Sequence, residues 1–150
     1  MNIRSLTPLQ YTNELNHLIE EIRLKPIEGK EAAGAELKRV YMKHIEWSEA
    51  IFKNLLKMIN SNDSNEKLGI QLVLLLSYGK LGGLIAVDHL SYVIQENETI
   101  TFVNRFLSVI FQQFTFNNDV YILKKTAEVF GKLVRMGGSR EFYFFSYLII

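Results

Sequence analysis

The side chains with the most chemical potential in this sequence are three histidines and the acidic residue beside one of them. His17, His44 and His89 occur singly, without the paired spacing that an HExxH metal site needs. Asp88 directly precedes His89 and invites an acid–base dyad, but adjacent residues of a helix point to different faces. All three histidines are therefore predicted to be helix-face or hydrogen-bonded residues, not metal ligands.

Glycine and lysine occur together at three places where a phosphate could bind, namely Gly29-Lys30, Gly79-Lys80 and Gly131-Lys132. All three lack the upstream glycine and the following Ser or Thr of a P-loop. The Gly82-Gly83 pair is better explained as a hinge or helix joint than as a phosphate cradle. The sequence also has no His-Arg-Asp catalytic loop and no Asp-Phe-Gly metal site. We therefore predict no catalytic, cofactor-binding or metal-ligating residue, and no cofactor.

The composition is that of one modest globular domain. The chain has 150 residues, of which 48% are apolar and 22% charged, enough for a real core. A net charge of +1 argues against nucleic acid as a partner, because phosphate binding needs a surplus of basic side chains. The segment from Thr101 to the end has six basic residues and three acidic ones. Two interpretations of this surplus stay open, namely a solvated helix face and a docking patch for an acidic partner. The six are Arg105, Lys124, Lys125, Lys132, Arg135 and Arg140.

Three features bear on the cellular compartment. The chain has no cysteine, which excludes disulfides and thiolate metal sites. Its first eight residues lack the apolar core of a signal peptide. The longest uncharged apolar run, residues 68–79, is shorter than the ~18 residues that a membrane span needs. We expect a cytoplasmic protein without a membrane span.

Hydrophobic periodicity in the N-terminal half predicts helices. The first begins at Thr7, with Pro8 at its first position, and ends before Pro26. The second runs from about Lys30 to Ile45 and continues, straight or bent, into a long apolar stripe. The inward side chains are predicted to be Tyr11, Leu15, Leu18, Ile19, Ile22, Leu37, Val40, Tyr41, His44, Trp47, Ala50, Ile51, Leu55, Met58 and Ile59.

The second half is predicted to begin after a turn at residues 60–64, with a capping box formed by Asp63 and Glu66. An apolar helix follows and is interrupted by a glycine-rich joint at residues 79–83. The last two helices are separated by residues 117–119, and Gly137-Gly138 is expected to end the last one. Their predicted inward residues are Phe102, Val103, Phe106, Leu107, Ile110, Phe114, Val120, Leu123, Ala127, Phe130 and Val134.

Two short apolar segments, residues 71–76 and 142–150, could form strands by periodicity alone. Without partner strands elsewhere, we interpret them as helix or frayed tail. The sequence thus predicts an all-α protein of stacked helical hairpins, a HEAT/armadillo-like α-α superhelix. Residues 1–150 would form a single helical-repeat unit of two to three hairpins.

The repeat spacing is irregular. The turns at Asn62-Asp63 and Asn118-Asp119 lie 56 residues apart (118 − 62), beyond the ~40–47 of a HEAT or armadillo unit. Lys67-Leu68-Gly69 recurs thirteen positions later as Lys80-Leu81-Gly82. Removing residues 70–82 shortens the spacing to 43 (56 − 13), within the HEAT range.

With that join, residues 35–142 resemble the N-terminal HEAT-repeat region of the target-of-rapamycin (TOR) kinases. The resemblance rests on an ordered series of short motifs, none of which is decisive alone. Up to the helix that contains Asp88, the motifs are an Asp-containing turn, Glu-Lys, a Gly-Gly pair and an Ala-x-Asp helix. In the last two helices, the motifs are an Arg followed by an apolar residue, an Asn-Asp turn, apolar-Gly-Lys-Leu and a closing Gly-Gly. The matching residues are Glu66, Lys67, Gly69, Gly83, Ala86, Asp88, Arg105, Phe106, Asn118, Asp119, Phe130, Gly131, Lys132, Leu133, Gly137 and Gly138.

The chain departs from the family pattern in two kinds of place. Where the family tends to have Ala, Tyr and Arg, this chain has Leu107, Val109 and Phe111. After Glu141 the expected acidic continuation gives way to an aromatic run. We hypothesise that residues 70–82 are an insertion and residues 143–150 an atypical tail.

The resemblance implies a scaffold function. TOR proteins are non-specific serine/threonine kinases of nutrient-responsive growth signalling, and this region would help to dock Raptor-like or other accessory subunits, in the cytoplasm or at endomembranes. The kinase domain itself is absent from the chain, so no enzyme activity is expected. An alternative is a free-standing small HEAT or armadillo adaptor that binds peptides or helices in a concave groove. Open repeat ends would also allow self-association.

Overall fold

The computed structural model describes residues 8–60, 70–116 and 119–149, and the side chains of residues 13–60, 79–115 and 119–137. Within these ranges the regular secondary structure is all helical, without a strand, so the all-α prediction is confirmed. No described helix is both long enough and apolar enough to cross a membrane. The α-helices are α1 (Pro8–Leu24), α2 (Ile27–Lys43), α3 (Ser48–Ile59), α4 (Ile70–Ser91), α5 (Thr99–Phe116) and α6 (Val120–Ile149), with short 3₁₀ turns η2 (Ile45–Trp47) and η4 (Glu96–Glu98).

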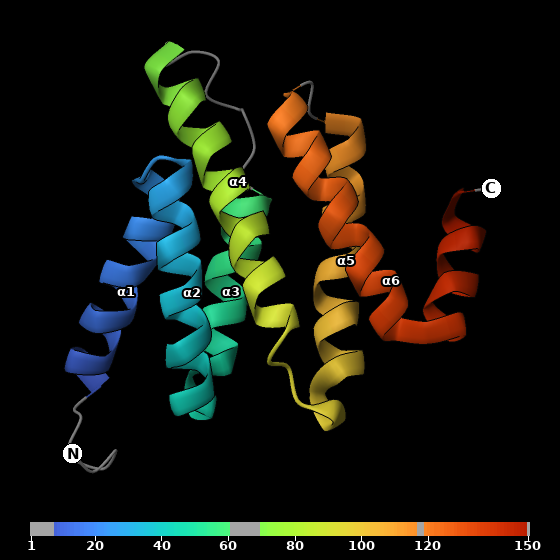
Figure 1. Ribbon diagram of the computed structural model, residues 1–150, viewed down its shortest axis with the longest axis horizontal. Coiled ribbons are helices and arrows are strands. Elements are labelled where there is room, and N and C mark those ends of the chain that lie inside the picture. Colours follow the sequence, from blue (N-terminus) through green and yellow to red (C-terminus); the bar gives the residue numbers. More distant parts are fainter. Residues whose placement is uncertain (1–7, 61–69, 117–118, 150) are drawn as a thin grey trace.

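Successive helices alternate in direction and pack side by side (Figure 1). Helices α2, α4 and α6 lie next to one another on the near face, with α3 and α5 behind them. Helix α4 is central, because it packs against α1, α2, α3 and α6. Helix α6 packs against both α4 and α5.

The first three helices follow the predicted boundaries closely. Helix α1 ends at Leu24, two residues before Pro26, as the steric restriction before proline requires. Helix α2 begins directly after Pro26, three residues earlier than predicted, and its first intrahelical bond joins the Lys30 amide to the Pro26 carbonyl at 2.9 Å. The predicted bend between α2 and α3 is the 3₁₀ turn η2. The Thr7 cap, the turn at residues 61–64 and the Asp63–Glu66 capping box lie outside the described residues.

The predicted glycine joint in the middle of the chain is wrong. Helix α4 runs without interruption through Gly79, Gly82 and Gly83. These glycines instead allow close helix packing, since a Cβ atom on Gly82 would lie 2.2 Å from the Ile22 carbonyl oxygen of α1. A Cβ atom on Gly83 would lie 2.7 Å from the Ile59 side chain of α3. The absence of side chains at these positions therefore sets the distance between helices.

The predicted stop at Gly137-Gly138 is also wrong, because α6 continues to Ile149. The segments at residues 71–76 and 142–149 are helical, as the helical interpretation expected. Figure 1 shows the last part of α6 turned away from the axis of its first part. A glycine pair followed by serine is a common place for such a change of direction.

The core confirms most of the predicted stripes in α1, α2, α3 and α5, but not in α6. Among the described side chains of α6, the buried apolar residues are Ile122, Val129 and Leu133, one position away from the predicted set. Leu123, Phe130 and Val134 are half-buried, while Ala127 and Val120 are exposed. In α5, Phe114 is 38% exposed, although it was predicted to be inward. The central residues, from five helices, include Ile22, Leu37, Tyr41, Ile51, Leu55, Leu84, Leu90, Phe102, Phe106 and Ile110.

Candidate functional site

A chain of charged side chains joins α2, α4 and α6 on one face of the bundle. The Asp88 carboxylate of α4 accepts hydrogen bonds from Lys125 Nζ, at 2.7 Å, and from Lys132 Nζ. Lys125 Nζ also lies 4.0 Å from a carboxylate oxygen of Glu31, on α2. The other Glu31 oxygen lies 2.8 Å from His89 Nε2. Ion pairs through Glu31 and Asp88 therefore link α2, α4 and α6, the second helices of the successive pairs α1–α2, α3–α4 and α5–α6.

Partial burial makes this network stronger than a surface ion pair. Burial raises the pKa of the Asp88 carboxyl, but the hydrogen bonds from Lys125 and Lys132 outweigh it, so the pKa lies below its usual value. Burial likewise lowers the pKa of Lys125 and Lys132, and their bonds to Asp88 reverse the direction. The three groups stay charged near neutral pH. Their chemistry is that of an interhelix clamp.

Asp88 and His89 do not form a dyad, as their adjacent positions on a helix predicted. The two side chains leave α4 in different directions, one to the lysines of α6 and the other to Glu31. His44 is buried and stacks on Trp47, with ring centroids 3.9 Å apart. His17 is exposed and lies 3.0 Å from Glu21. Among the described residues, no group of three or more His, Cys, Asp or Glu side chains could hold a metal ion.

The described basic side chains after Thr101 do not form one continuous patch. Arg105 makes two hydrogen bonds to the Glu49 carboxylate, at 2.7 and 2.9 Å. Lys125 and Lys132 are committed to Asp88. Of the six, Lys124 and Arg135 are exposed, and the Arg140 side chain lies outside the described ones. Neither a fully solvated basic face nor a broad patch for an acidic partner describes this arrangement.

A small hollow lies over α4 between α2 and α6. Its volume is about 160 Å³, below the ~300 Å³ at which small-molecule pockets begin, so it suits a single side chain of a partner. Its floor is apolar, with Leu81 and Ile85 buried beneath it. The full lining is Ile27, Glu31, Leu81, Ile85, Tyr121, Lys124, Lys125 and Glu128.

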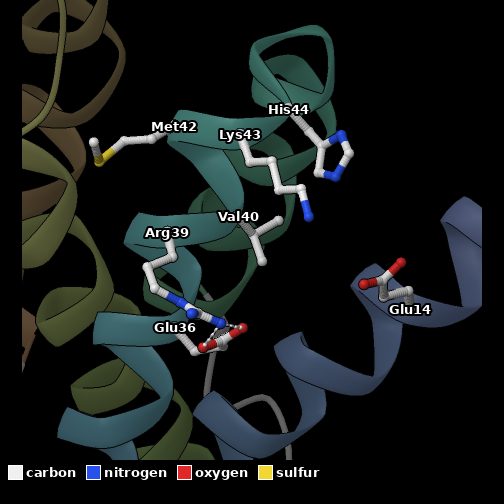
Figure 2. Close-up of a pocket in the computed structure, with 7 residues that line it drawn as sticks. All are labelled: Glu14, Glu36, Arg39, Val40, Met42, Lys43 and His44. Atoms are coloured by element: carbon white, nitrogen blue, oxygen red, sulfur yellow. Dashed lines mark hydrogen bonds and ion pairs between the residues drawn. The ribbon is translucent and has the colours of Figure 1, made fainter. Parts of the chain in front are cut away.

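A larger groove of about 490 Å³ lies between α1 and α2 (Figure 2). Most of its lining is charged or polar, and Glu36 and Arg39 pair with each other at 2.8 Å. Figure 2 shows Glu14 on α1, across the groove from the α2 residues. The remaining lining residues are Val40, Met42, Lys43 and His44. Binding pockets are mostly apolar with few polar groups, so this groove lacks the usual character of a ligand site.

The end of the bundle formed by α5 and α6 has an apolar surface, here called the α5–α6 flank. It comprises Phe111, Phe114, Leu123, Ala127, Phe130 and Val134. The Phe130 ring lies 5.7 Å from both Phe111 and Phe114, at angles typical of tilted and edge-on aromatic contact. All of these residues except Phe111 were predicted above to point inward, yet none of the six is fully buried. Exposed apolar groups in a contiguous patch mark interaction surfaces.

Sequence reasoning missed two buried lysines. Lys30 Nζ donates to the carbonyl oxygens of Ile22 and Arg23, at the end of α1. Lys80 Nζ donates to the Ile59 carbonyl oxygen and to the Gln113 side chain. Burial lowers the pKa of Lys30 to about 8. The sequence did contain one signal for such a site, a lysine among apolar residues. When these residues are buried, the lysine must be buried with them and needs hydrogen-bond acceptors.

The described residues thus present helix-capping lysines, an ionic clamp and two apolar surfaces, with no set of polar groups converging on a reaction site. The surfaces suited to a partner are the hollow between α2 and α6 and the α5–α6 flank. No protein-family model, no curated protein and no solved structure matches this chain.

Proposed function

We propose that this chain is a protein-binding scaffold segment, part of a helical-hairpin solenoid resembling the N-terminal HEAT region of a TOR kinase. The observation that carries the proposal is the α5–α6 flank. In a solenoid each hairpin buries its apolar faces against its neighbours, so the last hairpin of a segment leaves one face open. Half-buried Leu123 and Val134, with Ala127 exposed and Phe114 38% exposed, fit such an open face.

The alternating helix directions and the continuous layer of α2, α4 and α6 also support a solenoid (Figure 1). In HEAT and armadillo arrays, the second helices of successive hairpins line up in one layer. Here each helix of that layer packs on the next, through α2–α4 and α4–α6 contacts. The superhelical assignment remains our proposal.

The residues behind the TOR resemblance have structural roles that would suit repeat motifs. Gly83 allows α3 and α4 to approach closely, and Asp88 clamps α4 to α6. Arg105 pairs with Glu49 across α5 and α3. The Asp119 carboxylate accepts from the Tyr121 and Ile122 amides and so caps α6. Glu66, Lys67, Gly69 and Asn118 lie outside the described residues.

By this proposal the chain has no kinase activity of its own. It would bind a Raptor-like or another TOR-complex subunit, in the cytoplasm or at endomembranes. A direct test measures binding of the purified chain to a purified Raptor-like subunit by calorimetry. Binding that Phe114→Asp abolishes and Ile100→Asp preserves would support the proposal, because both positions are exposed on α5 but only Phe114 belongs to the flank. No binding by the unmodified chain would contradict it.

The second candidate is a free-standing adaptor, which the hollow between α2 and α6 favours. A helix layer with a side-chain-sized hollow suits a peptide or helix with an apolar anchor. Sequencing the genomic reading frame downstream separates the candidates. A frame that continues into further repeats and a kinase domain supports the TOR segment, and a stop codon directly after Ile150 supports the adaptor.

A further inference from the structure

The hollow between α2 and α6 has an apolar end and an acidic end. Because successive helices alternate in direction, α2, α4 and α6 run in the same sense (Figure 1). Ile27 and Tyr121 lie in the first turns of α2 and α6, and they are 42% and 67% exposed. Glu31 and Glu128 line the hollow further along the same helices. The step from the apolar to the acidic residues, four on α2 and seven on α6, is about 6–10 Å.

The apolar end suits one large apolar side chain of a partner. Its floor is formed by Leu81 and Ile85 of α4, which are both buried. Ile27 and Tyr121 add exposed carbon surface from the two neighbouring helices. An apolar side chain in this hollow of about 160 Å³ would remove surface of all four residues from water, which is favourable.

The acidic end has two carboxylates that are open to a further hydrogen-bond donor. Lys125 Nζ lies 4.0 Å from Glu31 Oε1 and 3.5 Å from Glu128 Oε2. Both distances exceed the about 2.7–2.9 Å of a charge-assisted hydrogen bond, which Lys125 makes with Asp88 instead, at 2.7 Å. The Glu31 and Glu128 side chains are each 48% exposed, so a second cation can reach them from solvent.

The charged groups that a partner can reach here favour a cationic side chain. Lys125 is only 16% exposed and is bound to Asp88. The exposed charges that line the hollow are therefore two carboxylates, of Glu31 and Glu128, and the ammonium of Lys124. An arginine fits two carboxylates best, because its planar guanidinium has five N–H donors in a fixed fork.

We propose that the hollow between α2 and α6 binds an extended segment of a partner protein with one large apolar side chain and an arginine about two or three residues from it. Two or three extended residues cover about 7–10 Å, which matches the step from the apolar to the acidic end. The guanidinium donates to Glu31 and Glu128, and the apolar side chain packs on Leu81 and Ile85. The proposal rests on the second candidate function, the adaptor, and specifies the chemistry of its partner.

Selection from a library of random peptides displayed on phage, with the purified full chain as the target, tests the proposal. We expect the selected peptides to share a large apolar residue with an arginine at the stated spacing. A selected peptide is then synthesised with a fluorescent label, and its affinity for variants of the chain is measured by anisotropy. On the unmodified chain, replacing the peptide's arginine by glutamine, or its apolar anchor by alanine, should each weaken binding. These two measurements do not depend on the folding of any variant.

Variants of the acidic end have a matched control. Glu31→Gln/Glu128→Gln should weaken binding about fivefold or more, because both acceptors of the guanidinium lose their charge. Glu28→Gln/Glu96→Gln removes two exposed carboxylates that do not line the hollow and should change the affinity by less than about twofold.

Variants of the apolar end and of the remaining cation complete the test. Ile27→Ser should weaken binding about fivefold or more. Ile100→Ser, at another exposed isoleucine in the first turn of a helix, should leave the affinity unchanged. Lys124→Gln should leave it unchanged or raise it, because the ammonium repels the partner's arginine.

Two kinds of result would overturn the proposal, and they differ in what they say about the adaptor. Selected peptides with acidic residues in place of the arginine, whose binding is weakened by Lys124→Gln and by Ile27→Ser, would overturn the proposed chemistry and leave the adaptor standing. No selected peptide, or binding that hollow and control variants affect equally, would overturn both.

Discussion

Lys80 of α4 donates a hydrogen bond to the carbonyl oxygen of Ile59, the last residue of α3, at 2.9 Å. The final carbonyls of a helix have no partner within it, and a cation there also interacts favourably with the helix dipole. Lys30 of α2 does the same at the end of α1, at 2.7 and 2.6 Å from two carbonyl oxygens. In both hairpins, the second helix therefore provides the C-terminal cap of the first.

Replacing Lys80 by methionine should lower the free energy of unfolding by roughly 1–3 kcal/mol. The substitution keeps the apolar stem but leaves the Ile59 carbonyl and the Gln113 side chain without this donor, and a buried polar group without its partner is costly. Urea denaturation measures the change. Lys57→Met, at an exposed position of α3, is the control and should change stability by less than about 0.5 kcal/mol. Equal effects at both positions would mean that the cap contributes nothing.

Lys30 should make stability depend on pH in the alkaline range. Burial lowers its pKa in the folded protein to about 8, from an ordinary value of 10.5. Between these values the unfolded chain binds more protons, so the free energy of unfolding should rise with pH. Relative to Lys30→Met, the wild type should gain on the order of 1–3 kcal/mol from pH 7.5 to 10.5. Denaturation of both proteins at several pH values gives this difference, in which the titration of the tyrosines cancels. A difference that stays constant with pH would refute the prediction.

Gly82→Ala and Gly79→Ala should have opposite effects. A Cβ atom at position 82 would meet the backbone of Ile22 at 2.2 Å, so α1 and α4 must move apart, at a net cost of roughly 1–3 kcal/mol. At position 79 the nearest atom is 3.4 Å away, on the flexible side chain of Arg23. There the higher helix propensity of alanine should stabilise the protein by about 0.5 kcal/mol. Thermal melts of both variants test the pair, and a stabilising Gly82→Ala would show that the two helices do not approach this closely.

Asp88→Asn should destabilise the protein by on the order of 2 kcal/mol, because Lys125 and Lys132 lose their shared anion while partly buried. Glu49→Gln, which weakens the exposed pair with Arg105, should cost less. The lowered pKa of Asp88 means that its contribution is present above pH about 4 and is lost as the pH falls further. The stability gap between wild type and Asp88→Asn should therefore close in acid. A gap that widens there would exclude the clamp.

Deleting residues 70–82 tests whether this segment is an insertion. In the structure, Lys80, Leu81 and Gly82 are buried in α4 against the neighbouring helices. We therefore expect the deletion variant to melt at a lower temperature and less cooperatively than the full chain. A deletion variant that is more soluble and more cooperative would support the insertion hypothesis.

The sequence predicted the helices of the first half well because Pro26 and a regular apolar period act locally. The predictions of a joint at residues 79–83 and of a helix end at Gly137-Gly138 were wrong. A glycine can end a helix, bend it or allow another helix to approach closely, and the local sequence does not distinguish these roles. Gly82 belongs to the last class only because Ile22, sixty positions earlier, packs against it. No local pattern contains that information.

The candidate surfaces were harder to predict for a related reason. Two adjacent apolar stripes on α6 give the same periodicity, and which one is buried depends on where α4 and α5 lie. The ion pairs of Lys125 and Lys132 with Asp88 agree with the rotation of α6 that places Ile122 and Leu133 inward. The sequence analysis named Asp88 as a residue of the family motif and rejected a dyad with His89. It did not predict that Asp88 pairs with Lys125 and Lys132.

The central position of α4 has a consequence for how the protein opens. The α1–α2 pair and the α5–α6 pair each fold from neighbouring segments, and α4 packs against both. Backbone amides of α4 should therefore exchange with solvent only when the whole bundle unfolds, while those of the outer pairs also exchange through partial opening. Under load, for example between partners pulling on the two ends, the chain would yield first at an outer pair and keep its middle intact.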